Sequence, residues 1–348
     1  MKDKLRVGII GVGGIGFDQH LPGWLKVPLA EIVAGADVSL VALDRAKTRF
    51  SIPHVFQDWR DLVAMEELDV VDICTPNRMH GPMTLAALEA GKHVLCEKPL
   101  ATSSAEVRAI ITAAEKAGKL VMSAQNLRFE SASMELKRLV DAGTFGEIYY
   151  ARAQWLRRRM LPPRPTFIEK RLSGGGPIFD LGVHILDLAY WLMGAPKPVS
   201  VSAVATDKLA HRSDLSSVWG EWERDKYDVE DFAAGFVRFE NGTSMTLETS
   251  WLAFQAEPEL RRLQFFGTSA GAIWPDGIIV GETNKSPWTM QLDDLPKTSS
   301  HHAEIASFAK AIEAGSPSPV ALADSLAVIQ ILEAFYRSSE LKKEVPVE

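Results

Sequence analysis

Residues 5–16 read Leu-Arg-Val-Gly-Ile-Ile-Gly-Val-Gly-Gly-Ile-Gly, and this stretch decides the fold. An apolar, strand-like run leads into Gly11, Gly13 and Gly16, and a helix is expected to open there. In this spacing the first glycine permits a tight turn, the second lets a pyrophosphate approach the backbone, and the third lets helix pack on strand. The stretch therefore predicts a dinucleotide-binding loop, with an ordinary tight turn as the alternative.

An acidic residue stands at the distance that such a loop requires. Asp37 follows Gly16 by 21 residues and ends the second apolar run, where a carboxylate accepts hydrogen bonds from a ribose and repels a 2′-phosphate. NAD is therefore the expected cofactor and NADP the less favoured one. Ser39 and Arg45 lie downstream and weaken the preference for NAD over NADP. The alternative interpretation of Asp37 is a solvated carboxylate at a strand end.

The pattern up to residue 125 alternates strand-like runs with helical segments, which is typical of an α/β fold with a doubly wound parallel sheet. The expected strands span residues 5–11, 31–37, 70–75, 93–96 and 120–124. The clearest helices are residues 80–90 and 103–117, which end at Gly91 and Gly118. We therefore predict a dinucleotide-binding Rossmann domain over residues 1–125.

A different pattern begins after residue 128. One helix (131–142) precedes strands expected at 148–156, 199–206, 233–239, 244–251 and 263–266, and two helices (303–314 and 323–342) close the chain. Asn241-Gly242 separates two of the strands and is a strong hairpin signal, so this pair is expected to be antiparallel. Residues 126–348 are predicted to form an α+β domain, with 207–228 as a polar surface loop.

Composition excludes several classes of protein. The 348 residues are 46% hydrophobic and 24% charged with a net charge of −7, so neither a small disulfide scaffold nor a nucleic-acid binder is expected. No apolar run is long enough for a membrane helix, and the first residues lack a secretory pattern. Cys74 and Cys96 are the only cysteines and are expected to be free thiols, so we predict a cytoplasmic protein without a bound metal.

Two polar motifs follow strands of the predicted parallel sheet. Thr75-Pro76-Asn77 with His80, and Glu97-Lys98-Pro99, both lie at the carboxyl edge where open α/β sheets bind ligands. Asn77 is equally suited to be a helix N-cap, and a single lysine is most often a solvated charge. Beside a nicotinamide site, however, Lys98 is able to hydrogen-bond a reacting oxygen and stabilise alkoxide character.

A third motif lies in the second domain. Ser173-Gly-Gly-Gly-Pro177 predicts that a helix begins at this point. The spacing of Asp180, His184 and Asp187 places these three residues along one face of that helix. Asp180 near the helix start is within reach of His184 and suited to orient its imidazole, which makes His184 a candidate general base. The alternative is an amphipathic helix whose histidine satisfies a buried hydrogen bond.

Together these motifs resemble the glucose-fructose oxidoreductase, inositol dehydrogenase and rhizopine catabolism (Gfo/Idh/MocA) family over nearly the whole chain. The resemblance implies that Lys98 contacts the nicotinamide ribose and the substrate hydroxyl, that Asp180 and His184 form an acid/base pair, and that the Lys98–Pro99 bond is cis. It also implies a homodimer or homotetramer formed through an open C-terminal sheet. The segment 155–170, with three consecutive arginines, has no fixed counterpart in the family and is expected to contribute to substrate choice.

The expected activity is NAD-dependent oxidation of a secondary hydroxyl on a sugar, sugar derivative or inositol. The expected cofactor contacts are Gly11, Gly13, Gly14, Ile15, Gly16, Asp37, Thr75, Pro76, Asn77, His80, Glu97 and Lys98. The expected substrate contacts are Lys98, Arg128, Trp155, Arg157, Lys170, Asp180 and His184. Two alternatives stay open: a glycosidase that oxidises its substrate transiently with NAD, and a non-catalytic nicotinamide-binding regulator.

Overall fold

The computed structural model describes residues 4–348, so the prediction that concerned the extreme N-terminus lies partly outside the described residues. The chain divides into two compact units. The first contains the residues up to Phe129 together with Thr298–Ser325, and the second contains Glu130–Lys297 and Leu326–Glu348. Each unit is described by itself.

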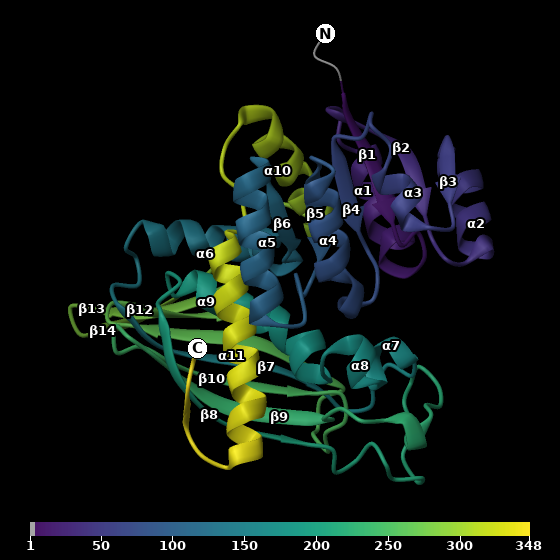
Figure 1. The fold of residues 1–348 in the computed structure, drawn as a ribbon. Helices are drawn as coiled ribbons and strands as arrows, with labels where there is room; N and C mark the ends of the chain where they lie inside the picture. Colours follow the sequence, from purple (N-terminus) through teal and green to yellow (C-terminus); the bar gives the residue numbers. More distant parts are fainter. Residues whose placement is uncertain (1–3) are drawn as a thin grey trace. The chain divides into compact units, whose positions relative to one another are not determined.

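The first unit is built on a six-stranded parallel sheet with the order β3-β2-β1-β4-β5-β6 (Figure 1). Its strands are β1 (Leu5–Ile10), β2 (Ala30–Ala36), β3 (His54–Phe56), β4 (Val70–Ile73), β5 (His93–Glu97) and β6 (Val121–Ala124). The strand order reverses between β1 and β4, and ligands of such sheets bind beyond the carboxyl ends at this point. The prediction of a doubly wound parallel sheet is confirmed.

Helices and single turns connect the strands of this sheet. They are η1 (Gly16–His20), α1 (Leu21–Leu25), α2 (Leu40–Phe50), α3 (Trp59–Val63), η2 (Asn77–Met79), α4 (His80–Glu89), α5 (Ser104–Ala117) and η3 (Asn126–Phe129). Gly118 ends α5 in the left-handed region at φ 62°, as its position in the sequence indicates. The segment after the glycine loop differs from a regular helix, because five π-helical residues precede α1.

A helix from late in the chain completes the core of the first unit. α10 (Ser300–Ala314) buries Ile305, Phe308 and Ala309 in the same apolar cluster as Leu21 and Trp24. A Cβ on Gly23 of α1 would lie 2.5 Å from the Ile305 side chain, so the two helices need this glycine to pack closely. The unit therefore differs from the predicted 1–125 domain by gaining residues 298–325.

The second unit contains a nine-stranded mixed sheet with the order β14-β13-β12-β11-β7-β10-β9-β8-β15. The strands are β7 (Ile148–Arg157), β8 (Pro198–Thr206), β9 (Phe232–Phe239), β10 (Ser244–Ser250), β11 (Glu259–Gly267), β12 (Ala270–Trp274), β13 (Ile278–Thr283), β14 (Ser286–Gln291) and β15 (Val345–Pro346). All neighbours are antiparallel except β7 and β10, which are parallel. The antiparallel hairpin predicted from Asn241-Gly242 is confirmed as β9–β10.

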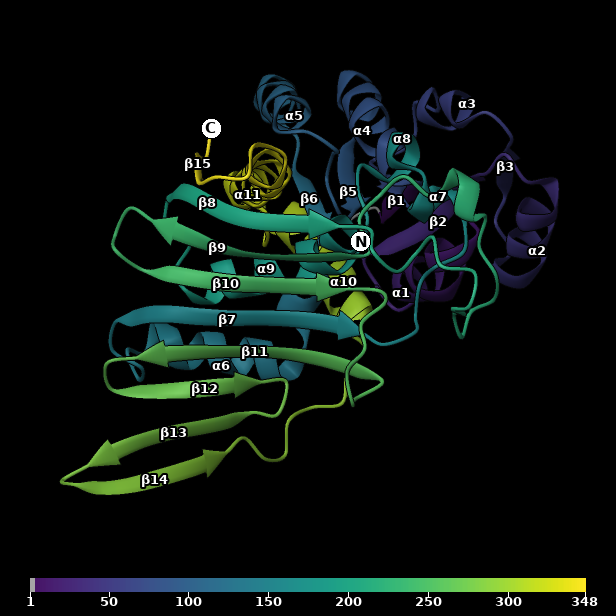
Figure 2. The ribbon, with the colours of Figure 1, turned by 90° about the horizontal axis from the view of Figure 1, so that it is seen from below.

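The long helices of the second unit lie on one face of its sheet, and short helical segments lie beyond the ends of the strands (Figure 2). Together these elements are α6 (Ser131–Asp141), α7 (Pro165–Ile168), α8 (Lys170–Ser173), η4 (Ile178–Gly182), α9 (Val183–Leu192), η5 (Arg224–Lys226) and α11 (Leu322–Leu341). Figure 2 shows α6, α9 and α11 behind the sheet, with β8 to β12 uncovered in front of them. Successive side chains of β7 and β10 therefore point in turn toward the helices and toward the open face. Trp155 points toward the helices, because its ring contacts His184 of α9.

The strands that the sequence pattern missed are β3, β12 to β14 and the two-residue β15. The polar segment 207–228 has little regular structure, as expected, but it is anchored: Trp222 is buried and donates to the Ala210 carbonyl, and the Leu209 and Ala210 amides donate to Asp231. Across residues 4–348, no helix combines the length and apolar character needed to cross a bilayer.

Candidate active site

The glycine loop after β1 packs tightly on the end of β4. Gly11 has φ +88°, and a Cβ there would lie 2.4 Å from the Cys74 carbonyl oxygen, while a Cβ on Gly16 would lie 2.0 Å from the Gly11 oxygen. At Gly13 the nearest atom to a Cβ would be 3.7 Å away, which is an ordinary contact. The first and third glycines are thus required by the fold itself, and the middle one leaves an open cradle that fits a pyrophosphate.

Asp37 lies beside this loop at the end of β2. Its carboxylate accepts the Gly13 amide at 3.2 Å and the Ser39 amide at 2.9 Å, so its position is held from both sides. Ser39 and Arg45, which weaken the predicted preference for NAD, have protein partners. Ser39 caps α2 by accepting the Ala42 amide, and the Arg45 guanidinium lies 3.6 Å from the centroid of the Phe17 ring.

The ends of β4 and β5 bring the other predicted cofactor residues to the same edge of the sheet. Thr75, Pro76 and Asn77 follow β4, and Glu97 ends β5 immediately before Lys98 and its cis bond to Pro99. The cis bond agrees with what the family resemblance implies.

His80 joins these two strand ends. Its Nδ1 lies 2.6 Å from the Pro99 carbonyl oxygen and its Nε2 lies 2.7 Å from the Thr75 carbonyl oxygen. Burial lowers the pKa of His80, against the opposing effect of its contacts with the Pro99 and Thr75 carbonyls. Any part that His80 has in cofactor binding therefore acts through the backbone at these two positions.

A buried ionic network lies beneath this edge, and sequence reasoning did not find it. His20 Nδ1 lies 2.8 Å from Asp72 Oδ2, and His20 Nε2 lies 3.0 Å from Glu97 Oε1. Trp24 Nε1 donates to Asp72 at 2.7 Å, and the Lys98 amide donates to Glu97 Oε2 at 3.0 Å. The four side chains come from η1, α1, β4 and β5, and the network ends at the backbone of Lys98.

The two cysteines are free, as predicted. Burial raises the pKa of both thiols, so neither is suited to be a nucleophile at neutral pH. His20, Asp72 and Cys74 place possible metal-ligand atoms within 4.8 Å of one another. The Asp72 oxygens already accept hydrogen bonds from Trp24 and His20, so protein donors occupy the positions that a cation would need.

In the second unit, the triple glycine is explained by what it packs against. A Cβ on Gly175 would lie 2.0 Å from Tyr336 Oη, and one on Gly176 would lie 2.1 Å from the Glu230 carbonyl oxygen. The Glu230 carboxylate accepts the amides of Gly176 and Ile178 at 3.0 Å and the Tyr336 hydroxyl at 2.6 Å. Glu230 therefore caps the helical segment that carries Asp180 and His184.

His184 faces an aromatic group from β7. The centroids of the His184 and Trp155 rings are 5.7 Å apart. Trp155 Nε1 donates to Glu259 at 2.7 Å, and Arg157 donates to the same carboxylate oxygen at 2.8 Å. These hydrogen bonds lower the pKa of Glu259 against the opposing effect of its burial. Trp155 and Arg157, both predicted to bind substrate, are thus locked together by one carboxylate.

Asp180 is held by a different indole. Trp251, which is fully buried, donates through Nε1 to Asp180 Oδ2 at 3.0 Å. Asp180 belongs to the π-helical turn η4, and His184 lies in the first turn of α9, which begins at Val183 directly after η4. Asp187, the third acidic or basic group predicted on this face, is fully buried.

Two predicted substrate residues have other partners in the structure. Arg128 is 2% exposed and donates to Asp324 at 2.9 Å within the first unit, so an ion pair accounts for its guanidinium. Lys170 is exposed, and its ammonium lies 4.9 Å from the centroid of the Tyr336 ring. A role of either residue in substrate binding stays a prediction.

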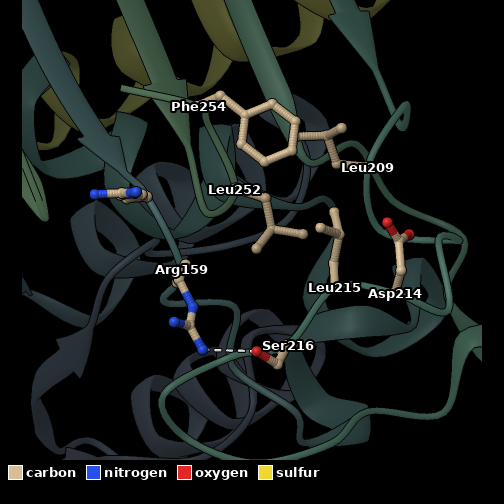
Figure 3. Close-up of a pocket in the computed structure, with 8 residues that line it drawn as sticks. Arg159, Leu209, Asp214, Leu215, Ser216, Leu252 and Phe254 are labelled. Carbon is tan, nitrogen blue, oxygen red and sulfur yellow. Dashed lines mark hydrogen bonds between the residues drawn. The ribbon is translucent and has the colours of Figure 1, made fainter. Parts of the chain in front are cut away.

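A surface cavity of about 270 Å³ lies beyond the ends of β7 and β10 (Figure 3). Its walls are Arg158, Arg159, Leu209, Asp214, Leu215, Ser216, Leu252 and Phe254. Arg159 donates to Ser216 at 2.6 Å across one side of it. Arg158 and Arg159 belong to the segment 155–170 that is expected to contribute to substrate choice, whereas Lys98, Asp180 and His184 are not among the walls of this cavity.

Comparison with known proteins decides the family. Residues 5–125 match the model described as "Oxidoreductase family, NAD-binding Rossmann fold", and residues 133–273 match the "GFO/IDH/MocA C-terminal domain". D-glucoside 3-dehydrogenase of Escherichia coli strain K12 is 33% identical over 97% of this chain and 95% of its own length. The chain belongs to the Gfo/Idh/MocA family.

Other members of the Gfo/Idh/MocA family support the same assignment. Levoglucosan dehydrogenase of Pseudarthrobacter phenanthrenivorans is 30% identical over 71% of this chain and 67% of its own length. A structure of levoglucosan dehydrogenase in complex with NADH and levoglucosan superposes with a TM-score of 0.86, at 25% identity over 99% of this chain and all of the other. The predictions of an oxidoreductase with an NAD-binding Rossmann domain are therefore confirmed.

The structurally important residues that sequence reasoning missed carry no local signal. His20, Asp72 and Glu230 stand singly in the sequence, and the side-chain partners that hold them in these networks are 48 or more positions away in the chain. Trp251 and Glu259 lie at strand ends, where a polar partner for Asp180 or Trp155 is not predictable from spacing. Trp155 and Trp251 give an indirect signal. Each is a large residue with a single N–H donor, which needs an acceptor when the side chain is buried.

Proposed function

We propose that this Gfo/Idh/MocA protein is an NAD-dependent dehydrogenase that oxidises a secondary hydroxyl of a sugar, sugar derivative or inositol. The observation that carries the proposal is the pair formed by His184 and Trp155, an imidazole against an indole, in a chain with an NAD-binding Rossmann domain. An imidazole is suited to take a hydroxyl proton near neutral pH, and an indole face suits the apolar face of a sugar ring. Glucoside and levoglucosan dehydrogenases are relatives.

The proposed roles follow from chemistry. Bound NAD supplies the hydride acceptor, and the glycine loop with Asp37 is proposed to hold it. His184 is proposed to accept the hydroxyl proton at an imidazole nitrogen, and Asp180 to orient the ring and stabilise its charge. The Lys98 ammonium is proposed to stabilise the developing alkoxide. Together Lys98 and His184 lower the cost of deprotonating the alcohol before C–H cleavage.

Trp155, Arg157 and Lys170 are proposed to line the substrate site. The Arg157 guanidinium lies 5.6 Å from the centroid of Trp155 and 5.1 Å from that of Trp219, so Glu259 and two indoles fix its plane. A guanidinium fixed in this way is suited to donate hydrogen bonds to neighbouring hydroxyls. We therefore favour sugars with several free hydroxyls over small alcohols.

The substrate proposal is tested by a screen of glucosides, anhydrosugars, aldoses and inositols with NAD and NADP, followed at 340 nm. Net NADH formation with at least one of them is expected. Substrate turnover without NADH accumulation would instead support the glycosidase mechanism, since that reaction regenerates the cofactor. Absence of any turnover, with NAD still bound in a calorimetric titration, would favour a regulatory protein.

The cofactor preference has its own test. Asp37→Ser removes the charge that repels a 2′-phosphate and leaves the loop glycines unchanged. The NAD-to-NADP ratio of kcat/KM is expected to fall by roughly 10 to 100-fold, the range of one lost charge interaction. An unchanged ratio would contradict the role proposed for Asp37.

We further propose that the open sheet face forms a homodimer or homotetramer interface. Cross-strand contacts on this face join Tyr150 to Thr246, Gln154 to Glu248, and the rings of Tyr150 and Phe266. Side chains tied to each other in this way form a rigid, partly apolar surface. Light scattering is expected to give a mass that is a multiple of 38.3 kDa, and Phe236→Arg on the same face to reduce it.

The cytoplasm is the proposed location. Two free thiols, Cys96 buried and Cys74 partly buried, suit a reducing compartment. Fractionation of cells that express the full-length protein, followed by immunoblotting, is expected to recover it with cytosolic enzymes. Recovery with membranes or in the medium would contradict this location.

A further inference from the structure

The residues beneath Lys98 form a continuous chain of charged hydrogen bonds. Trp24 donates to Asp72, His20 contacts Asp72 on one side and Glu97 on the other, and Glu97 accepts the backbone amide of Lys98. His20 and Asp72 are fully buried and Glu97 is 8% exposed. Water therefore competes little with these contacts, and each strand end is held relative to its neighbour.

Hydrogen-bond geometry defines the charge state of His20. Both ring nitrogens face carboxylate oxygens, which only accept, so both nitrogens must carry protons for the two contacts to form. Burial alone would lower the pKa of His20, but the facing Asp72 carboxylate raises it well above the usual value. His20 is therefore an imidazolium, and it holds the pKa of Glu97 at about 2 despite the opposing effect of burial.

Burial shifts the pKa values of the other titratable groups around His20 toward their neutral forms. Burial raises the pKa of Cys74 and of Glu304, and it lowers the pKa of His301, whose ring centroid is 6.5 Å from that of His20. Both carboxyl oxygens of Glu304 are buried without a hydrogen-bond partner in the described residues, as a neutral acid tolerates better than an ion does. One imidazolium and two carboxylates thus leave a single net negative charge below Lys98.

We propose that His20, with Asp72 and Glu97, positions Lys98 for the dehydrogenase reaction. The proposal rests on the proposed function, in which Lys98 contacts the reacting oxygen. Glu97 accepts the Lys98 amide through Oε2 while His20 holds its other oxygen, Oε1. His20 and Asp72 are positioning residues, since they act through Glu97 and the backbone of β5.

Removal of the imidazolium has a defined consequence. Without it, the buried carboxylates of Asp72 and Glu97 lose the cation between them, and burial then favours a protonated Glu97. A protonated carboxyl presents an O–H as well as a carbonyl, and an O–H turned toward the Lys98 amide places two donors against each other. The end of β5 is then expected to shift, which displaces the ammonium without emptying the glycine loop.

The test uses three variants of the full chain: His20→Gln, His20→Gln with Glu97→Gln, and His93→Gln. His93 begins the same strand and accepts the Leu120 amide, so its replacement is a control for the loss of a partly buried histidine. For His20→Gln, kcat at pH 8 is expected to fall by about 10 to 100-fold, as for a displaced catalytic group, while the Kd for NAD changes less than about threefold.

The pH profile separates positioning from general damage. In His20→Gln, kcat is expected to show a new acid limb, rising with pH as Glu97 loses its proton. The double variant is expected to lack this limb, because glutamine does not titrate, and His93→Gln is expected to keep the wild-type profile. If His20→Gln does not fold, Glu97→Gln alone is expected to lower kcat with NAD binding retained.

The charge state is tested without activity by ¹⁵N NMR of histidine-labelled protein. His20 is expected to show both ring nitrogens protonated from pH 6 to 9. A neutral His20 at pH 7, or a His20→Gln enzyme with wild-type kcat and pH profile, would overturn the positioning proposal. If Lys98→Ala also keeps full activity, the proposed role of Lys98 fails as well; if only Lys98→Ala is inactive, the positioning proposal alone is wrong.

Discussion

The two units hold their candidate catalytic groups by different means. In the first, Lys98 follows a strand end that a buried imidazolium and two carboxylates hold in place. In the second, His184 and Asp180 are placed by indoles, Trp155 at a ring distance of 5.7 Å and Trp251 through an N–H donor. The proposed catalytic cation is thus supported by ions, and the proposed base is supported by aromatic groups.

This difference has an energetic meaning. An ionic network in the interior is sensitive to the loss of one member, because the remaining charge is left without a partner. An aromatic wall with one hydrogen bond tolerates a smaller ring at moderate cost. Substitutions in the first unit should therefore change activity or stability more steeply than matched ones in the second.

Lys98→Ala tests the group that the ionic network supports, and the largest effect is expected here. Turnover should fall at least about a hundredfold, within the range for lost acid/base or oxyanion groups, and NAD binding should be retained. Steady-state kinetics and calorimetric NAD titration measure the two quantities. Lys98→Arg keeps the charge but changes its geometry, and near-normal turnover in Lys98→Ala would remove this lysine from the mechanism.

Asp72→Asn tests the network itself through stability. The substitution leaves a buried imidazolium with one carboxylate fewer, and breaking such a pair costs about 3–5 kcal/mol. Thermal unfolding should therefore shift down by about 10 °C. Asp69→Asn is the control, since the exposed Asp69 accepts only the Arg6 amide nearby and a shift below about 3 °C is expected. Equal shifts for the two variants would contradict a special role of the network.

Trp251→Phe tests the aromatic support in the second unit. It removes the donor to Asp180 and leaves a smaller ring, so kcat/KM should fall by about tenfold, the value of one hydrogen bond to a charged group. Trp222→Phe is the matched control, because Trp222 is also buried and donates to the Ala210 carbonyl. The control should lose stability to a similar extent and keep its kcat/KM.

Glu304→Gln is expected to have the smallest effect, and it should raise the unfolding temperature where the other substitutions lower activity or stability. Burial, and the nearby charge of Glu97, raise the pKa of Glu304 well above its usual value. A raised folded-state pKa means that its contribution to stability is present below the unfolded pKa near 4.3 and is lost as pH rises. Glutamine has no such loss, so unfolding at pH 8 should occur a few degrees higher, with little change at pH 4.

The exposed Glu313 on the same helix provides the control for that experiment. Glu313→Gln is expected to leave the unfolding temperature unchanged within about 1 °C at both pH values. A lower unfolding temperature of Glu304→Gln at pH 8 would show that the Glu304 carboxyl is ionised in the folded protein. The net charge assigned to the network around His20 would then change.

Much of the architecture was predictable from the sequence. The glycine spacing, Asp37 and the alternation of elements predicted the parallel sheet, and Asn241-Gly242 predicted a hairpin, because these features are local. The strands β12 to β14 were missed, since Gly271, Gly281 and Pro287 weaken the alternating pattern. α10 was predicted as a helix, but its packing into the first unit depends on Gly23 and Ile305, which lie 282 positions apart.

The candidate site divides in the same way. Lys98, His184 and Asp180 stand in recognisable motifs, whereas His20, Asp72, Glu230 and Trp251 become visible only through their partners. A residue that supports another through a long-range contact has no characteristic spacing, so a single sequence cannot reveal it. Arg128 likewise has a long-range partner that spacing does not reveal, because an aspartate 196 positions later pairs with it.

The late return of α10 to the first unit has a consequence for synthesis. A ribosome that has made residues 1–129 has produced all six strands of the parallel sheet, but not Ile305 and Phe308, which complete its apolar cluster. The apolar cluster of the nascent Rossmann unit is therefore incomplete, with Leu21 and Trp24 uncovered, until about 170 further residues have been synthesised. Shortened clones that stop after β6 should accumulate in inclusion bodies rather than as free NAD-binding modules.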